Sequence, residues 1–216
     1  MKLTLENVSK TLKGTKIIEN VSLTLVGGRV YGLQGYNGSG KTMLMRLMAG
    51  LIRPTEGQID IDGQVLGRDI DFPPSIGLLL ENPAFLPNYT GMENLTLIAS
   101  LNGRADNARI REGIARVGLD PEDKRKYRKY SLGMKQRLGI ACAIFETPDM
   151  ILLDEPTNAL DQDGVALVND IIKQERERGT LVVLASHAQE SMESLADEIY
   201  VIEQGRIVSS HPGGAV

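Results

Sequence analysis

The stretch GYNGSGKT, residues 35–42, constrains the fold more than any other part of the chain. It matches the pattern G-x-x-x-x-G-K-[ST], follows the strand-like run RVYGLQ and precedes a helical pattern that begins at Lys41. Glycines let such a loop curl until its backbone N–H groups face phosphate oxygens, and the helix N-terminus adds partial positive charge. The motif and its context therefore predict a phosphate-binding loop in an α/β fold, rather than a glycine-rich turn that only caps a helix.

Two side chains of this loop carry specific chemistry. Lys41 is expected to reach the β- and γ-phosphates of a nucleotide, and the Thr42 hydroxyl is expected to bind Mg²⁺. The other residues of the predicted binding loop are Gly35, Tyr36, Asn37, Gly38, Ser39 and Gly40.

Short apolar runs outline the sheets. Alternation within residues 3–25, and GQIDIDG at 57–63 with its Asp-Gly turn, predict an antiparallel β layer at the N-terminal side. Residues 150–153, 180–186 and 198–202 read as buried strands with helices between them, which predicts a mostly parallel sheet.

Helical patterns occupy the middle of the chain. Residues 92–119 read as helices broken at Gly103 and Gly118, and a further helix is expected to begin near Leu132. We therefore expect a P-loop NTPase core with a mostly parallel sheet, an antiparallel β layer and a helical subdomain, all in one domain over residues 1–216. About 1–80 and 145–210 would form the core with its antiparallel layer, and about 90–144 the helical subdomain.

Composition excludes several classes of protein. The chain has 216 residues, with 42% hydrophobic and 24% charged, as in ordinary globular domains. A net charge of −4 gives no global basic field for nucleic acid. The single cysteine, Cys142, lies in an apolar stretch and is expected to be a buried small residue. No apolar run approaches about 18 residues and no signal peptide is visible, so we expect a cytosolic chain.

The run MILLDEP, residues 150–156, places two acids at the end of a buried strand. Ligands of α/β sheets bind at that end, and neighbouring strand residues point to opposite faces. Asp154 is therefore expected to hold Mg²⁺, through water, while Glu155 orients or deprotonates an attacking water. The alternative is that the two acids are simply solvated at a strand end before a proline turn. The presence of a phosphate loop about 112 residues earlier in the same chain disfavours this alternative.

The run YSLGMKQRL, residues 130–138, has two readings. Met134, Leu138, Ala141 and Phe145 form one apolar stripe of a helix. Ser131 and Gly133 lie at the N-terminus of that helix, where free N–H groups and a hydroxyl can meet an anion. His187, after LVVLAS, is ambiguous from the residues alone, since a histidine at a strand end is more often polar surface.

In this order, GYNGSGKT, YSLGMKQRL, ILLDEPTNALD and ASH resemble the nucleotide-binding subunit of ABC transporters over nearly the whole chain. The resemblance implies an ATPase that uses ATP and Mg²⁺ and dimerises head to tail. Each ATP would contact the phosphate loop of one copy and the signature residues of the other: Ser131, Leu132, Gly133 and Met134. It also implies that His187 bonds the γ-phosphate and that Asp161 belongs to a loop communicating across the dimer.

Three departures from the family pattern qualify these expectations. Glu81 stands where the family has a metal-binding glutamine, so it could bind Mg²⁺ while adding a negative charge near the γ-phosphate. Leu12 stands where an aromatic residue stacks on adenine, a contact worth about 1–3 kcal/mol in nucleic-acid sites. Leu132 and Met134 replace a glycine and a glutamine of the signature.

The segment ENPAFLPNYTGMENL, residues 81–95, together with YSLGMKQRL, looks most like exporters of the bacitracin- and lantibiotic-resistance type. That resemblance implies a separate membrane-spanning permease subunit docked on residues 81–95, with the ATPase peripheral at the cytoplasmic face of the membrane. One set of motifs implies a homodimer.

Two other functions are compatible with parts of the sequence. The first is a soluble ABC ATPase acting on nucleic acid or ribosomes, which the basic run DKRKYRK, residues 123–129, superficially suits. A solvated helix edge is the simpler reading of that run, and no nucleic-acid partner is expected. The second rival, a regulatory module without turnover, is disfavoured by the presence of Glu155.

Overall fold

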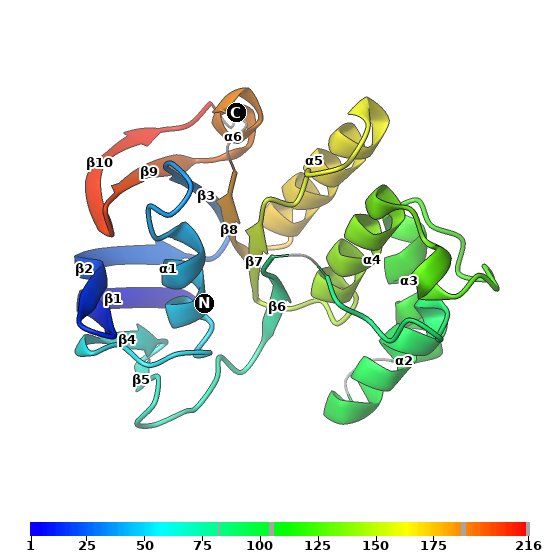
Figure 1. The fold of residues 1–216 in the computed structure, drawn as a ribbon, viewed down its shortest axis with the longest axis horizontal. Helices are drawn as coiled ribbons and strands as arrows, with labels where there is room; N and C mark the ends of the chain where they lie inside the picture. Colours follow the sequence, from blue (N-terminus) through cyan, green and yellow to red (C-terminus); the bar gives the residue numbers. More distant parts are fainter. Residues whose placement is uncertain (82, 104–105, 187–188, 215–216) are drawn as a thin grey trace.

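The computed structural model describes residues 1–81, 83–103, 106–186 and 189–214. Figure 1 shows an antiparallel sheet on one side, a second sheet in the middle and a group of helices on the other side. Strands within residues 2–65 build the first side, and residues 91–144 build most of the helical side.

The antiparallel sheet has the strand order β2-β1-β4-β5. Leu3 and Leu5 of β1 lie opposite Leu25 and Leu23 of β2, and opposite Ile61 and Ile59 of β4, so one face of the sheet is continuously apolar. The alternation in the sequence is therefore confirmed as one buried face of a layer. Its strands are β1 (Lys2–Leu12), β2 (Thr15–Val26), β4 (Glu56–Ile61) and β5 (Gln64–Val65).

The central sheet has the order β10-β9-β3-β8-β7-β6, and only β10 runs antiparallel to its neighbour. The predicted mostly parallel sheet is confirmed. Its strands are β3 (Arg29–Gln34), β6 (Ile76–Leu79), β7 (Met150–Asp154), β8 (Leu181–Ala185), β9 (Glu198–Glu203) and β10 (Arg206–Pro212).

Both faces of the central strands β3, β7 and β8 are buried, which explains the uninterrupted apolar runs in the sequence. In β7, Met150 and Leu152 face a core shared with the antiparallel sheet and helix α1 (Lys41–Met48). Ile151 and Leu153 face a second core made with the helical side. By the same alternation, Asp154 at the end of β7 is on the face that Met150 and Leu152 share.

The helical side confirms the predicted breaks at glycine. Gly103 ends α2 with φ 64°, and Gly118 follows α3 with φ 72°, conformations that glycine adopts at no steric cost. The helices and the short 3₁₀ turn are α2 (Gly91–Asn102), α3 (Asn107–Arg116), η1 (Tyr127–Lys129), α4 (Leu132–Ile144), α5 (Gln162–Glu177) and α6 (Gln189–Leu195).

The contact between α4 and the sheet depends on the absence of a side chain at Gly77. A Cβ built there would overlap the carbonyl oxygen of Ala143 on α4. We expect Gly77→Ala to lower the free energy of unfolding by about 1–3 kcal/mol, because either the strand or the helix must move. Urea unfolding followed by circular dichroism measures this change. An unchanged midpoint would mean that α4 can move away from β6 without cost.

Candidate nucleotide-binding site

The predicted phosphate loop connects β3 to α1 and depends on its glycines. Gly38 has φ 81°, and Gly40, the residue before α1, has φ 114°. Both values are unfavourable for residues that carry a Cβ. A Cβ on Gly35 would overlap the carbonyl oxygen of Ile202. The sequence pattern therefore folds as a tight strand–loop–helix turn.

Lys41 closes back over this loop. Its Nζ donates hydrogen bonds to the carbonyl oxygens of Gly35 (2.7 Å) and Tyr36 (3.1 Å), and the residue is 7% exposed. Burial lowers the pKa of the Lys41 ammonium, and the nearby carboxylates of Glu155 and Asp154 oppose that shift. The ammonium lines a cavity in which it can attract an anionic group.

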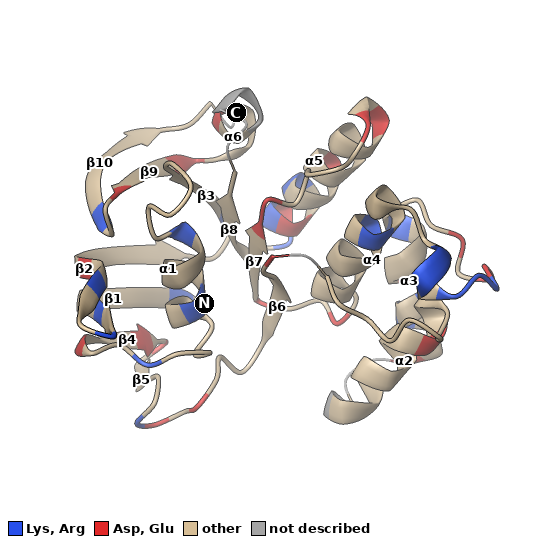
Figure 2. Ribbon diagram, viewed as in Figure 1, with Lys and Arg blue, Asp and Glu red and all other residues tan. Residues whose placement is uncertain are grey.

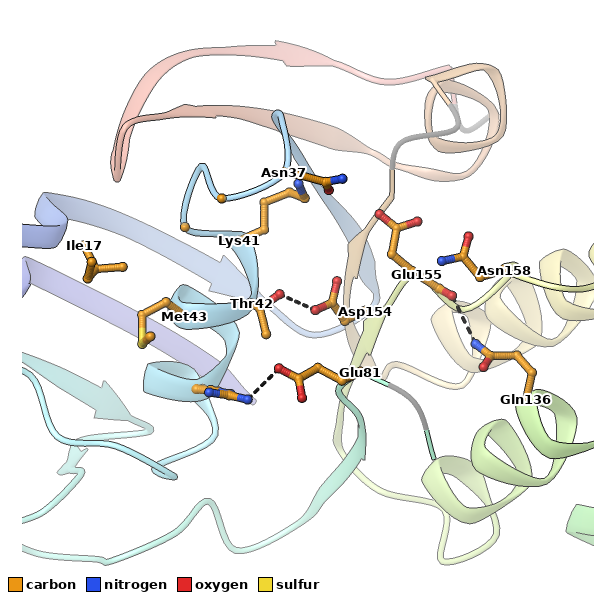
Figure 3. Close-up of a pocket in the computed structure, with 13 residues that line it drawn as sticks. Ile17, Asn37, Lys41, Thr42, Met43, Glu81, Gln136, Asp154, Glu155 and Asn158 are labelled. Atoms are coloured by element: carbon orange, nitrogen blue, oxygen red, sulfur yellow. Dashed lines mark hydrogen bonds and ion pairs between the residues drawn. The ribbon is translucent and has the colours of Figure 1, made fainter. Parts of the chain in front are cut away.

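Asp154 points to the side of the sheet where α1 lies. It follows Leu152 by two positions and so shares its face, and its Oδ2 accepts a hydrogen bond of 2.5 Å from the Thr42 hydroxyl. Figure 3 shows the two side chains pointing toward each other. This pair joins the C-terminal end of β7 to the first turn of α1, and its oxygen atoms are ligands that suit Mg²⁺.

Glu155 has the left-handed φ of 50°, which is uncommon for a residue other than glycine. Its N–H donates to the carbonyl oxygen of Ala185 on β8 (2.8 Å), and its carbonyl accepts from the N–H of Asn158 (3.2 Å). The side chain lines the same cavity as Lys41 and Asp154 (Figure 3). Both acids therefore line one cavity, whereas strand alternation predicted opposite faces. Alternation does not apply to Glu155, because it follows the last residue of β7 and has a left-handed φ.

These groups share one cavity of about 480 Å³. Five of the predicted loop residues line it: Asn37, Gly38, Gly40, Lys41 and Thr42. Tyr36 does not line the cavity and is 82% exposed. Five lining residues were not predicted: Ile17, Met43, Arg46, Gln136 and Asn158. Two of these lie in stretches that the sequence analysis singled out, Gln136 in YSLGMKQRL and Asn158 in ILLDEPTNALD, but neither was assigned a role at the nucleotide.

Glu81 reaches the cavity, but its carboxylate has a partner on α1. Arg46 Nη2 lies 2.6 Å from Glu81 Oε1, and both residues line the cavity. Figure 3 shows the Glu81 carboxylate below Thr42 and Asp154. The negative charge that the sequence places near the nucleotide is thus balanced by a neighbouring guanidinium.

The signature residues lie elsewhere. Ser131 caps α4, its Oγ accepting from the Met134 N–H at 3.2 Å, and Leu132 is 64% exposed. Asp161 caps α5 and pairs with Arg137 at 3.1 Å. Ser131, Gly133, Met134 and Asp161 line a second cavity of about 680 Å³, and none of them lines the phosphate-loop cavity.

The remaining sequence expectations have simple outcomes. Leu12 is 41% exposed and does not line the cavity, whereas Ile17 does. Cys142 is half-buried rather than fully buried, and desolvation raises the pKa of its thiol to about 12, which agrees with an inert residue. His187 lies outside the described residues. Within the described residues, no helix is long and apolar enough to cross a membrane.

The basic run at 123–129 is largely neutralised by acids. Arg125 pairs with Asp123 at 2.8 Å, and Lys126 pairs with Glu93 at 3.0 Å. Figure 2 shows the ribbon of this part of the chain, with acidic positions in red close to the basic ones in blue. Nucleic-acid binding would need unpaired cations on one surface, so this segment gives that rival function little support.

Comparison with known proteins identifies the family. The family model described as ABC transporter matches residues 18–158. The uncharacterized ABC transporter ATP-binding protein YybJ of Bacillus subtilis is 48% identical over 94% of this chain and 94% of its own length. The bacitracin transport ATP-binding protein BcrA of Enterococcus faecalis is 38% identical over 94% of this chain and 67% of its own length.

A solved structure gives the same result. The dimeric structure of a post-hydrolysis state of the ATP-binding cassette MJ0796 bound to ADP and Pi superposes with a TM-score of 0.88 at 26% identity. That match covers 97% of this chain and 98% of the cassette. With the phosphate loop, the Thr42–Asp154 pair and Glu155 in one cavity, these matches show that the chain belongs to the ABC transporter family and is an ATP hydrolase of that family.

Proposed function

We propose that this chain binds and hydrolyses ATP to energise export through a separate membrane-spanning permease subunit. The observation that carries the proposal is the single cavity in which the phosphate loop, Lys41, Asp154 and Glu155 meet. Two kinds of relative support a role in transport: the bacitracin transport ATP-binding protein BcrA and the lantibiotic transport ATP-binding protein SrtF of Streptococcus pyogenes, 35% identical over 95% of this chain. The export direction comes from the resemblance noted in the sequence.

Each group in the cavity has a proposed role. Residues 35–40 and Lys41 bind the phosphates, and Glu155 orients or deprotonates the attacking water. Thr42 and Asp154 would hold Mg²⁺, Asp154 through water, with Glu81 as a further oxygen ligand. When bound, Mg²⁺ neutralises phosphate charge. His187 is proposed to bond the γ-phosphate, although it lies outside the described residues.

The fit to Mg²⁺ rests on the donor set. Mg²⁺ binds through one or two protein oxygens plus phosphates and water. The Thr42 hydroxyl and the Asp154 carboxylate are oxygen donors already in contact at 2.5 Å.

A second copy of the chain is proposed to complete the site. Ser131, Leu132, Gly133 and Met134 of one copy would contact the ATP held by the other, and Asp161 would communicate across the interface. Two observations support this: Ser131, Gly133 and Met134 line a cavity apart from the phosphate loop, and the similar cassette MJ0796 is dimeric.

We also propose where the other partners act. Residues 81–95 would dock the permease, which would hold the chain at the cytoplasmic face of the membrane, and no nucleic-acid partner is proposed. Residues 1–216 would form one ABC-type domain, with the helical subdomain over about 90–144.

The test measures phosphate release from ATP by the purified full chain, with Mg²⁺ and with EDTA. Metal-dependent release is expected, whereas no release with the permease present would contradict the proposal. Purification from membranes should recover a multi-span protein whose yield falls when residues 81–95 are altered. Recovery of nucleic acid in a salt-dependent manner would favour the rival function.

The Arg46–Glu81 pair gives a separate prediction. Arg46→Met should raise the KM for Mg·ATP by about 3- to 10-fold, because it leaves an unbalanced negative charge beside the phosphates, at about 1 kcal/mol. Adding Glu81→Gln to Arg46→Met should return the KM towards the wild-type value.

The matched control is Arg53→Met, which breaks another exposed pair, Arg53–Asp71 at 3.3 Å. Its KM should equal that of the wild type. If the double variant is no better than Arg46→Met alone, charge balance at Glu81 is not what Arg46 provides.

A further inference from the structure

We propose that Gln136 is a positioning residue that ties the signature helix α4 to the main chain of Glu155, so that α4 controls the orientation of the hydrolytic carboxylate in its own chain. The proposal rests on the role proposed above for Glu155. Gln136 was not among the site residues expected from the sequence.

The contact uses both hydrogens of one buried amide. Gln136 is 6% exposed, and its Nε2 donates to the carbonyl oxygens of Glu155 (3.0 Å) and Pro156 (3.1 Å). Figure 3 shows the Gln136 side chain reaching from α4 to the Glu155 main chain. A side-chain amide has two N–H donors, so the pair of carbonyls matches its capacity.

The two carbonyls lie where the chain leaves the sheet. The Glu155 N–H is fixed by Ala185 of β8 at 2.8 Å, and φ of Glu155 is 50°. A residue other than glycine keeps this conformation only where its surroundings hold it. Strand β8 holds the N-terminal side of Glu155, and Gln136 holds the C-terminal side. Together these bonds set the direction in which the carboxylate enters the cavity.

The same helix carries the signature residues. Ser131 caps α4, and Gln136 lies less than two turns further along the helix. A Cβ on Gly133 would lie 3.0 Å from the carbonyl oxygen of Ala159, so the start of α4 also packs on the segment after Pro156. A displacement of α4 on contact with a partner copy would therefore be transmitted to Glu155 through two hydrogen bonds.

The test compares three variants of the full chain in steady-state ATP hydrolysis and in ATP binding. Gln136→Met keeps the length of the side chain and removes both donors. Gln136→His keeps an N–H donor close to the position of Nε2. Gln174→Met is the matched control, since Gln174 is exposed on α5 and accepts a bond from Arg116 (3.1 Å).

We expect Gln136→Met to lower kcat by about 10- to 100-fold, since a misplacement of about 1 Å at a reacting group costs about that much. The KM and the Kd for ATP should be unchanged within error. Gln136→His should retain more of the kcat than Gln136→Met, and Gln174→Met should match the wild type.

Three results would overturn the proposal: an unchanged kcat in Gln136→Met, an equal loss in the Met and His variants, or a parallel loss of ATP binding. The last would mean that Gln136 supports the whole site rather than Glu155. Failure of the proposed function is separable, because then Glu155→Gln itself would leave phosphate release unaltered.

Discussion

Glu155→Gln is expected to slow phosphate release from Mg·ATP by about 10²- to 10⁴-fold, the usual contribution of a general base. The amide keeps the size of the side chain, but it neither accepts a proton at neutral pH nor polarises water as a carboxylate does. Because Lys41, Thr42 and Asp154 remain, ATP still binds. The ATP-bound dimer should therefore accumulate, and size-exclusion chromatography with light scattering would detect its doubled mass.

The matched control is Glu177→Gln, which removes an exposed carboxylate at the end of α5. Its rate should equal that of the wild type. If Glu155→Gln turned over ATP at the wild-type rate, another group would activate the water. The reading of β7 as the strand that delivers the base would then be wrong.

Ser131→Arg is expected to lower turnover by about 10²-fold or more while each chain still binds ATP. Losing a phosphate-binding donor in a closed site costs about 10²- to 10³-fold. The arginine would also place a long side chain where the partner's nucleotide must approach. Titration with a fluorescent ATP analogue measures ATP binding separately from turnover. Binding should be retained, because none of the signature residues lines the phosphate-loop cavity.

Loss of the helix cap is a competing cause, since Ser131 Oγ accepts from Met134 N–H at 3.2 Å. Ser131→Asp addresses it, because aspartate is a good N-cap but repels phosphate. It should lose turnover as Ser131→Arg does. Asp106→Ala, which removes the cap of α3, should keep the wild-type rate. Full turnover by Ser131→Asp would mean that the signature does not meet phosphate.

The fold could be predicted because its causes are local. The loop glycines allow the turn between β3 and α1, and strands buried on both faces must be apolar throughout. Asp154 was predictable in the same way, since alternation along β7 fixes its face. The prediction that the signature residues serve a second chain came from the family resemblance. In this chain Ser131, Gly133 and Met134 line a cavity apart from the phosphate loop, so the role in a second chain stays a prediction.

The rest of the site depends on contacts between distant residues. Arg46 and Glu81 are 35 positions apart, and Gln136 and Glu155 are 19 apart. No periodicity or spacing in the sequence specifies such a pairing. It arises when α1, α4 and the loop after β6 are packed around β7. Ile17 was missed for the same reason, since the antiparallel sheet brings it to the cavity only after folding.

The central claim is that each ATP site is shared between two copies of the chain. The most direct test mixes two variants of strongly reduced turnover, Lys41→Ala and Ser131→Arg, and measures phosphate release by the mixture. A mixed dimer would pair the intact phosphate loop of one chain with the intact signature of the other, so turnover should rise above that of either variant alone. A mixture as inactive as its components would contradict the shared site.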